Sequence, residues 1–148
     1  MKRNNNGFTL VEMMLVLAII GILMAVSAPG IMTWIRMAQY RGVAQEVDSA
    51  LRETRSRAIT NNRQHRIVFF VGDGRQRFRV EGSNGGIWTT LRQWEVPATV
   101  RLTGNLTPLV FNPNGSAGAD TVNICDVNDS VKVRVILASS GRVRIDSP

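Results

Sequence analysis

The sequence predicts an α+β fold in which one long N-terminal helix precedes an antiparallel sheet. Residues 8–28 are mainly apolar and contain one ionisable side chain, Glu12; residues 36–62 carry apolar side chains every three to four positions, and from about residue 66 the apolar period changes to two. A helical period followed by a strand period predicts that one face of the helix packs against the sheet. The residues expected on that face are Val43, Val47, Leu51 and Ala58.

The apolar run at residues 8–28 has the length of a membrane-spanning helix. Its 21 residues extend about 30 Å at a rise of about 1.5 Å per residue, which matches the hydrocarbon core of a bilayer. A carboxylate in such a segment costs on the order of 2.5 to 3.5 kcal/mol to insert, so Glu12 is expected to be paired or functional. Lys2 and Arg3 precede the run and predict that the N-terminus stays in the cytoplasm while the C-terminal part crosses the membrane.

Two simpler interpretations of the N-terminus are an ordinary secretory signal peptide and a plain single-pass anchor. Val26-Ser27-Ala28 loosely fits a small-residue cleavage site. However, the apolar run is longer than the roughly 7 to 15 residues of a signal sequence, and Pro29 follows the site directly. An anchor explains the length of the run but neither the Gly7-Phe8 junction nor the glutamate.

The segment Gly7-Phe8-Thr9-Leu10-Val11-Glu12, followed by an apolar helix, resembles the class III signal of type IV pilins and pseudopilins. The resemblance implies that a prepilin peptidase cleaves after Gly7 and methylates the new terminal amine of Phe8. It also implies that Glu12 pairs with the terminal amine of a neighbouring subunit in a filament. The physical chemistry agrees, because a buried carboxylate and a buried ammonium each offset the other's desolvation penalty.

A second resemblance lies near the C-terminus. Residues 111–115, Phe-Asn-Pro-Asn-Gly, and residues 139–145, Ser-Ser-Gly-Arg-Val-Arg-Ile, are similar to the C-terminal half of the GspH/FimT family of minor pilins and minor pseudopilins. This implies a type IV pilin-like fold, a single-pass anchor in the bacterial inner membrane, a periplasmic C-terminal domain, and assembly with other pilins or pseudopilins into a pilus or pseudopilus. The expected organisation is a leader at residues 1–7, a transmembrane and assembly helix at 8–35, and a globular domain at 36–148 whose helix covers 36–62.

Strand patterns follow the helix, which should end near Asn61-Asn62, where two poor helix formers meet. The segments 66–71 and 77–81 predict a β-hairpin. Residues 88–96 indicate another strand pair, with both of their tryptophans in the core or on a sheet face. Further short strands are expected at residues 99–102, 109–111, 131–137 and 142–145.

The sequence contains no pattern typical of an enzyme. His65 is the only histidine and stands at the end of the helix, where a solvated or capping role is expected. Nothing ties it to Cys125, the only cysteine, or to a serine, as a nucleophile and its base require. Cys125 cannot form an intramolecular disulfide and is expected to be buried. We expect no catalytic residue, cofactor or metal, because the candidate oxygen ligands lack a calcium-loop spacing; these are Asp120, Asp126, Asn128 and Asp129.

Positive charge is the strongest functional signal outside the N-terminus. The formal net charge is +7, and sixteen of the eighteen basic residues are arginine. Arginine binds phosphate through two parallel hydrogen bonds and stacks on bases, so this composition favours polyanions as partners. The alternative is that the helix arginines are solvated or contact acidic neighbours in a filament.

The sharpest candidate for a polyanion site is Gly141-Arg142-Val143-Arg144. On a strand, Arg142 and Arg144 share one face about 7 Å apart, which is comparable with the spacing of phosphates along a nucleic-acid strand. Gly141 permits a tight turn before them. Lys132 and Arg134 can add charge from the preceding strand.

The Gly-Arg-x-Arg pattern resembles the motif of FimT-type minor pilins that bind DNA during natural transformation. The resemblance implies a minor type IV pilin that binds the phosphate backbone of extracellular DNA without sequence preference. The alternative is a structural role without DNA contact, as a minor pseudopilin of a type II secretion system or as a minor pilin that primes pilus assembly.

Overall fold

A computed structural model describes residues 9–147, apart from the side chains of residues 26–29. The fold is α+β, as predicted: within these residues one helix, α1 (Leu10–Thr60), precedes eight strands. The chain forms two compact units, one extending to Arg36 and the other beginning at Met37. The predicted cleavage and methylation site at Gly7 and Phe8 lies outside the described residues.

Helix α1 has clear signals at both ends. The hydroxyl of Thr9 accepts a hydrogen bond of 3.2 Å from the backbone N–H of Glu12, which is the geometry of an N-cap. At the other end Asn62 adopts a φ of 49°, and the N–H of Arg63 donates to the carbonyl of Ala58 at 3.2 Å. This left-handed cap ends the helix next to the predicted Asn61-Asn62 boundary.

The first unit exposes its apolar side chains. Glu12 lies in the first turn of α1 and is also exposed. Neither Leu10–Ala25 nor Gly30–Thr60, the segments of α1 on either side of residues 26–29, is by itself long and apolar enough to cross a bilayer, whereas the two together reach the required length and composition. The most exposed apolar residues of this unit include Leu10, Val11, Leu17, Ile22, Leu23 and Met24.

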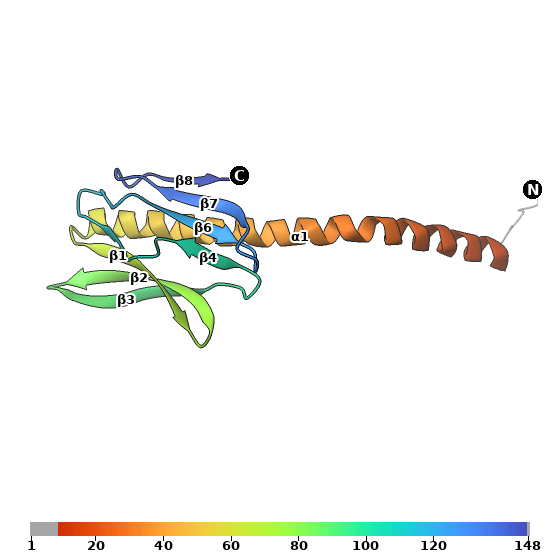
Figure 1. Cartoon of the computed structure of the whole chain (residues 1–148), viewed down its shortest axis with the longest axis horizontal. Helices are drawn as coiled ribbons and strands as arrows, with labels where there is room; N and C mark the ends of the chain where they lie inside the picture. Colours follow the sequence, from red (N-terminus) through yellow and green to blue (C-terminus); the bar gives the residue numbers. More distant parts are fainter. Residues whose placement is uncertain (1–8, 148) are drawn as a thin grey trace, which may run out of the picture. The chain divides into compact units, whose positions relative to one another are not determined.

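The second unit contains two antiparallel four-stranded sheets (Figure 1). The first has the order β3-β2-β1-β5 and the second the order β4-β6-β7-β8. The strands of the first sheet are β1 (His65–Gly72), β2 (Arg75–Asn84), β3 (Ile87–Glu95) and β5 (Leu109–Phe111). Those of the second are β4 (Arg101–Gly104), β6 (Asp120–Cys125), β7 (Val131–Leu137) and β8 (Val143–Asp146).

Most predicted strands are confirmed, one expectation is wrong, and one strand was missed. The β1–β2 hairpin pairs Ile67 with Val80 and Phe69 with Phe78, and these four side chains are buried. Residues 88–96 do not form a strand pair, because β3 is a single strand that pairs with β2. Strand β6 was not predicted.

One core joins the helix to both sheets. The predicted stripe of α1 is buried, with Val43 4% exposed and Val47, Leu51 and Ala58 fully covered. Figure 1 shows strands β6 and β7 beside the C-terminal half of α1. The sheets supply mainly β-branched and aromatic residues to the same cluster, including Ile67, Phe78, Val80, Phe111, Ile124, Val133 and Val135.

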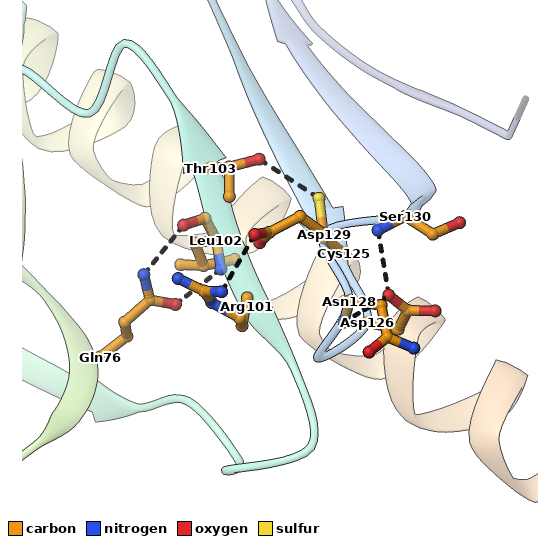
Figure 2. Close-up of polar contacts among 9 residues, drawn as sticks. All are labelled: Gln76, Arg101, Leu102, Thr103, Cys125, Asp126, Asn128, Asp129 and Ser130. Atoms are coloured by element: carbon orange, nitrogen blue, oxygen red, sulfur yellow. Dashed lines mark hydrogen bonds and ion pairs between the residues drawn. The ribbon is translucent and has the colours of Figure 1, made fainter.

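A single side-chain amide links the two sheets. The Nε2 of Gln76, on β2, donates to the carbonyl of Leu102 at 2.9 Å, and the N–H of Leu102 donates to the Oε1 of Gln76 at 2.6 Å (Figure 2). The amide therefore pairs with β4 as a strand backbone does, and it satisfies two backbone groups between the sheets.

The expectations for the tryptophans and for Cys125 are confirmed, and that for His65 is wrong in part. Trp94 stacks on Phe78 with ring centroids 5.1 Å apart, and Trp88 lies partly buried on the other face of the sheet, so the prediction for both tryptophans is confirmed. Cys125 is buried, as expected. Of the two roles expected for His65, solvated or capping, the solvated role is wrong, because the side chain is buried. Its Nδ1 lies 3.1 Å from the carbonyl oxygen of Arg63, just after the end of the helix.

Candidate nucleic-acid interface

The two C-terminal motifs meet at a pair of glycine turns. Gly115 has a φ of 79° and Gly141 a φ of 75°, in the left-handed region that favours glycine. A Cβ atom on Gly141 would collide with the carbonyl oxygen of Gly115 and stand 2.8 Å from the Nε of Arg55. A Cβ atom on Gly115 would stand 2.9 Å from the Cδ1 of Ile59. The absence of a side chain at both positions lets the turns pack against each other and against α1.

Gly141 also closes the hairpin that presents the arginine motif. Its N–H donates to the carbonyl of Ala138 at 2.8 Å, and the N–H of Ala138 donates to the carbonyl of Arg142 at 2.9 Å. Strand β8 starts at Val143, so Arg142 lies in the turn just before the strand and not within it. Val143 pairs with Leu137, and both are buried.

The outer face of this hairpin carries two of the predicted arginines. Arg144 pairs with Ile136 and Arg134 pairs with Asp146, so all four residues lie on the face opposite the buried Val143. Arg134 and Arg144 therefore occupy diagonal positions, which are typically about 7 to 8 Å apart. Both are exposed, and β8 forms the edge of its sheet.

Lys132 is less free than the arginines. Its Nζ lies 3.3 Å from the Oδ2 of Asp126 and donates to the hydroxyl of Ser130 at 2.9 Å. The Oδ1 of Asp126 accepts the backbone N–H groups of Ser130 and Asn128 at 2.9 Å each (Figure 2). The hydrogen bond from Ser130, with those from Asn128 and Lys132, holds the pKa of Asp126 below its ordinary value. The carboxylate is therefore ionised and partly compensates the charge of Lys132.

The other acids of this loop have structural partners as well. Asp129 adopts a φ of 61° and accepts a hydrogen bond of 3.0 Å from Arg101, and Asp120 binds the N–H of Thr121 at 2.7 Å. Residues 9–147 contain no group of three histidine, cysteine or acidic side chains placed to hold a metal ion.

Two arginines of α1 contact the C-terminal motifs directly. The Nη2 of Arg52 donates to the carbonyl of Val143 at 3.0 Å, and the Nε of Arg55 donates to the carbonyl of Gly115 at 3.1 Å. From the sequence, these arginines were expected to be solvated or to contact acidic neighbours, and their contacts with the C-terminal motifs were not foreseen. Their spacing of three residues was the available signal, because it places both on one side of the helix.

Carboxylates neutralise most arginines of the sheets, but not those of the β7–β8 hairpin. Among the described residues, no carboxylate lies within ion-pair distance of Arg134, Arg142 or Arg144. Elsewhere, ion pairs join Arg66 and Arg79 to Glu81, Arg75 and Arg77 to Glu95, Arg92 to Glu53, and Arg101 to Asp129.

A long N-terminal helix packed against antiparallel sheets, with an N-terminal processing motif, defines the pilins and pseudopilins. Residues 2–28 match the prokaryotic N-terminal methylation motif. Residues 43–141 match the family described as type II transport protein GspH, so the chain belongs to the GspH family. It is therefore a minor pilin or pseudopilin, anchored in a membrane, of a type IV pilus or a type II secretion system.

Solved structures show the same fold at low sequence identity. The minor pseudopilin EpsH from the type 2 secretion system of Vibrio cholerae superposes with a TM-score of 0.62 at 15% identity, over 74% of this chain and 98% of EpsH. The type IV minor pilin FimU of Pseudomonas aeruginosa gives a TM-score of 0.62 at 19% identity, over 75% of this chain and 93% of FimU. None of the curated proteins matches the sequence significantly.

Proposed function

We propose that this protein is a minor type IV pilin whose β7–β8 hairpin binds extracellular DNA for uptake in natural transformation. The observation that supports this function is the group of exposed arginines without carboxylate partners among the described residues, Arg134, Arg142 and Arg144. A guanidinium that has no internal carboxylate keeps its full attraction for phosphate.

The binding is non-specific, because the contacts are to the phosphate backbone. Each phosphate neutralised on duplex DNA contributes about −0.9 to the slope of log affinity against log salt, so a few arginines give weak and salt-sensitive binding. Several subunits, or other minor pilins, along one filament strengthen the capture through avidity. Lys132 contributes less than the arginines because Asp126 lies beside it.

Delivery to the filament depends on the other end of the chain. A prepilin peptidase cleaves between Gly7 and Phe8 and methylates Phe8, which leaves a charged amine at the new N-terminus. Glu12 is exposed in the first turn of that helix, where it can reach the terminal amine of a neighbouring subunit. The anchor lies in the inner membrane, and the C-terminal domain is periplasmic.

A double substitution, Arg142→Ala with Arg144→Ala, tests the DNA site. We expect it to abolish most of the mobility shift that the full-length chain, in a non-ionic detergent, produces with duplex DNA. The matched control is Arg75→Ala with Arg77→Ala, which removes the same charge from arginines already paired with Glu95. An unchanged shift for the first double variant, or an equal loss in both, would remove the assignment.

The second candidate function is a structural subunit without DNA contact, either a minor pseudopilin of a type II secretion system or a minor pilin that primes pilus assembly. The description of the matching family, type II transport protein, favours it. Deletion of the gene separates the two candidates: loss of secretion or of pili with normal transformation indicates the structural role, and loss of transformation with both intact indicates the DNA role.

A further inference from the structure

A cleft of about 330 Å³ lies between the C-terminal half of α1 and the turn that precedes β8. This volume is at the lower end of the range for pockets that bind small ligands. None of the lining residues is acidic, and three are arginines. The lining residues are Arg52, Arg55, Ser56, Ile59, Gly141, Arg142 and Val143.

The two helix arginines are held in place by the protein itself. Asp48 accepts two hydrogen bonds, of 3.0 and 2.9 Å, from the Nε of Arg52, whose Nη2 donates to Val143. The Nε of Arg55 donates to the carbonyl of Gly115. A guanidinium has five N–H donors, so these bonds fix each group and leave further donors available. Groups fixed before binding lose less entropy when a ligand arrives.

We propose that this cleft binds one phosphate group of the DNA backbone and forms part of the DNA-binding surface; the proposal rests on the function given above. Arg55 has no carboxylate partner among the described residues, and its two terminal amino groups can bind an anion. Ser56 adds a hydroxyl donor, and the exposed Ile59, 48% accessible, offers an apolar wall to the adjacent sugar.

The cleft and the outer face of the β7–β8 hairpin are continuous through Arg142. Arg142 lines the cleft and immediately precedes β8, whose Arg144 faces outward beside Arg134. A nucleic-acid strand bound along the outer face therefore passes the turn at Gly141 and reaches the cleft. The helix arginines extend the phosphate-binding surface beyond the Gly-Arg-x-Arg motif.

Two charge-matched variants of the full-length chain test the cleft. Arg52→Gln removes a cleft arginine, and Arg57→Gln removes one outside the cleft. Both arginines are exposed, at 60% and 45%, and each pairs with a carboxylate four residues earlier. We measure binding to fluorescent duplex DNA by anisotropy in a non-ionic detergent at several salt concentrations. We expect Arg52→Gln to weaken binding and to reduce the salt slope by up to about 0.9, since Asp48 already compensates part of the charge of Arg52, and Arg57→Gln to change the affinity less than twofold.

A third variant avoids the contacts that Arg52 makes with the hairpin. Ser56→Glu places a carboxylate in the cleft next to both helix arginines, and we expect it to weaken DNA binding at least as much as Arg52→Gln. Thermal unfolding of each variant shows whether the fold is kept. Equal effects of Arg52→Gln and Arg57→Gln, together with unchanged binding in Ser56→Glu, overturn the proposal.

A separate measurement distinguishes failure of the cleft from failure of the proposed function. If the wild-type chain binds no DNA, the proposed function fails and DNA is excluded as the source of the phosphate. Inorganic pyrophosphate is then titrated while the Nε–H resonance of Arg55 is followed by NMR. A saturable shift that Ser56→Glu removes supports a phosphate site independent of DNA. The absence of a shift overturns the proposal that the cleft binds phosphate.

Discussion

The outer face of β1 and β2 and the β7–β8 hairpin are both rich in arginine, but they differ in what surrounds the charges. On the first face Glu81, whose side chain is 4% exposed, lies 2.6 Å from the Nε of both Arg66 and Arg79. Arg66 also covers the ring of Trp88 at 4.0 Å, and Arg79 covers Phe70 at 4.9 Å. These arginines are structural, because their charge and planar groups are used within the sheet.

The β7–β8 hairpin shows the opposite arrangement. Its arginines have no ion pair among the described residues. The one acidic residue of β7 and β8, Asp146, stands opposite Arg134 across the strand pair but makes no ion pair with it. A polyanion site is therefore expected where arginines remain after internal pairing, and not simply where arginines are numerous.

The largest expected effect concerns the turn that holds the unpaired arginines. Gly141→Ala adds a side chain at a φ of 75° and against the backbone of Gly115. A left-handed conformation costs an L-residue about 1 to 2 kcal/mol, and overpacking adds about 1 to 3, so we expect a loss of about 2 to 5 kcal/mol. Urea denaturation of the full-length chain measures it.

The β1–β2 hairpin, whose arginines are paired with carboxylates, supplies the control for this substitution. Gly74, in the β1–β2 turn, has a φ of 73° but nothing within 4 Å of the position of a Cβ atom. Gly74→Ala therefore loses only the conformational part, about 1 to 2 kcal/mol. Equal losses for the two variants would show that the Gly115–Gly141 contact does not restrict the hairpin.

The next effect concerns the paired face. Glu81→Gln leaves Arg66 and Arg79 without their carboxylate. Removing one partner of a fully buried pair costs about 3 to 5 kcal/mol. We expect about 2 to 4 kcal/mol here, because these arginine side chains are 26% and 35% exposed and solvent screens them. Urea denaturation again measures the change.

The DNA binding of Glu81→Gln, compared with that of the wild type, tests the role of internal pairing directly. If internal pairing is what keeps the first face from binding polyanions, Glu81→Gln gives a steeper salt dependence than the wild type. Glu95→Gln, at the exposed partner of Arg75 and Arg77, is the stability control and is expected to cost much less. A loss of stability as large as that of Glu81→Gln would contradict the structural role assigned to the buried carboxylate.

Sequence periodicity predicted the elements whose apolar residues follow a simple pattern. The α1 stripe and the β1–β2 hairpin belong to this class, because one face of each is buried. Strand β6 was missed because three of its first four residues, Asp120, Thr121 and Asn123, are polar and read as a loop. Its register with β4 and β7, which exists only in the folded chain, makes it a strand.

The same division applies to the candidate site: its local motif could be predicted from the sequence, but its long-range contacts could not. The arginine motif is local in sequence, and its turn glycine was recognised. By contrast, Arg52 donates to Val143 across 91 residues and Arg55 donates to Gly115 across 60, and no local pattern carries such contacts. The requirement for glycine at 141 also depends on a distant residue, Gly115. Contacts between residues so far apart in the sequence are set by tertiary packing and not by local sequence patterns.

The smallest expected effect on DNA binding concerns Lys132. Asp126→Asn keeps an oxygen that can accept the N–H groups of Asn128 and Ser130, but it removes the negative charge beside Lys132. We expect a modest gain in DNA affinity and a salt slope steeper by up to about 0.9. Asp129→Asn makes the same change in net charge beside Arg101, on the opposite edge strand of the sheet, and is expected to leave the slope unchanged.

The effect of Asp126 on stability should depend on pH with a definite sign. Hydrogen bonds from Ser130 and Asn128 and the charge of Lys132 lower the pKa of Asp126 in the folded protein. A lowered pKa means that the ionised carboxylate stabilises the fold above the unfolded-state pKa, near 3.9, and that this stabilisation is lost as the pH falls through the folded pKa. The wild type should therefore exceed Asp126→Asn in stability by a constant amount above about pH 5, and the difference should shrink below the unfolded-state value. A difference that grows on acidification would show that the hydrogen bonds from Ser130 and Asn128, together with Lys132, do not favour the ionised carboxylate.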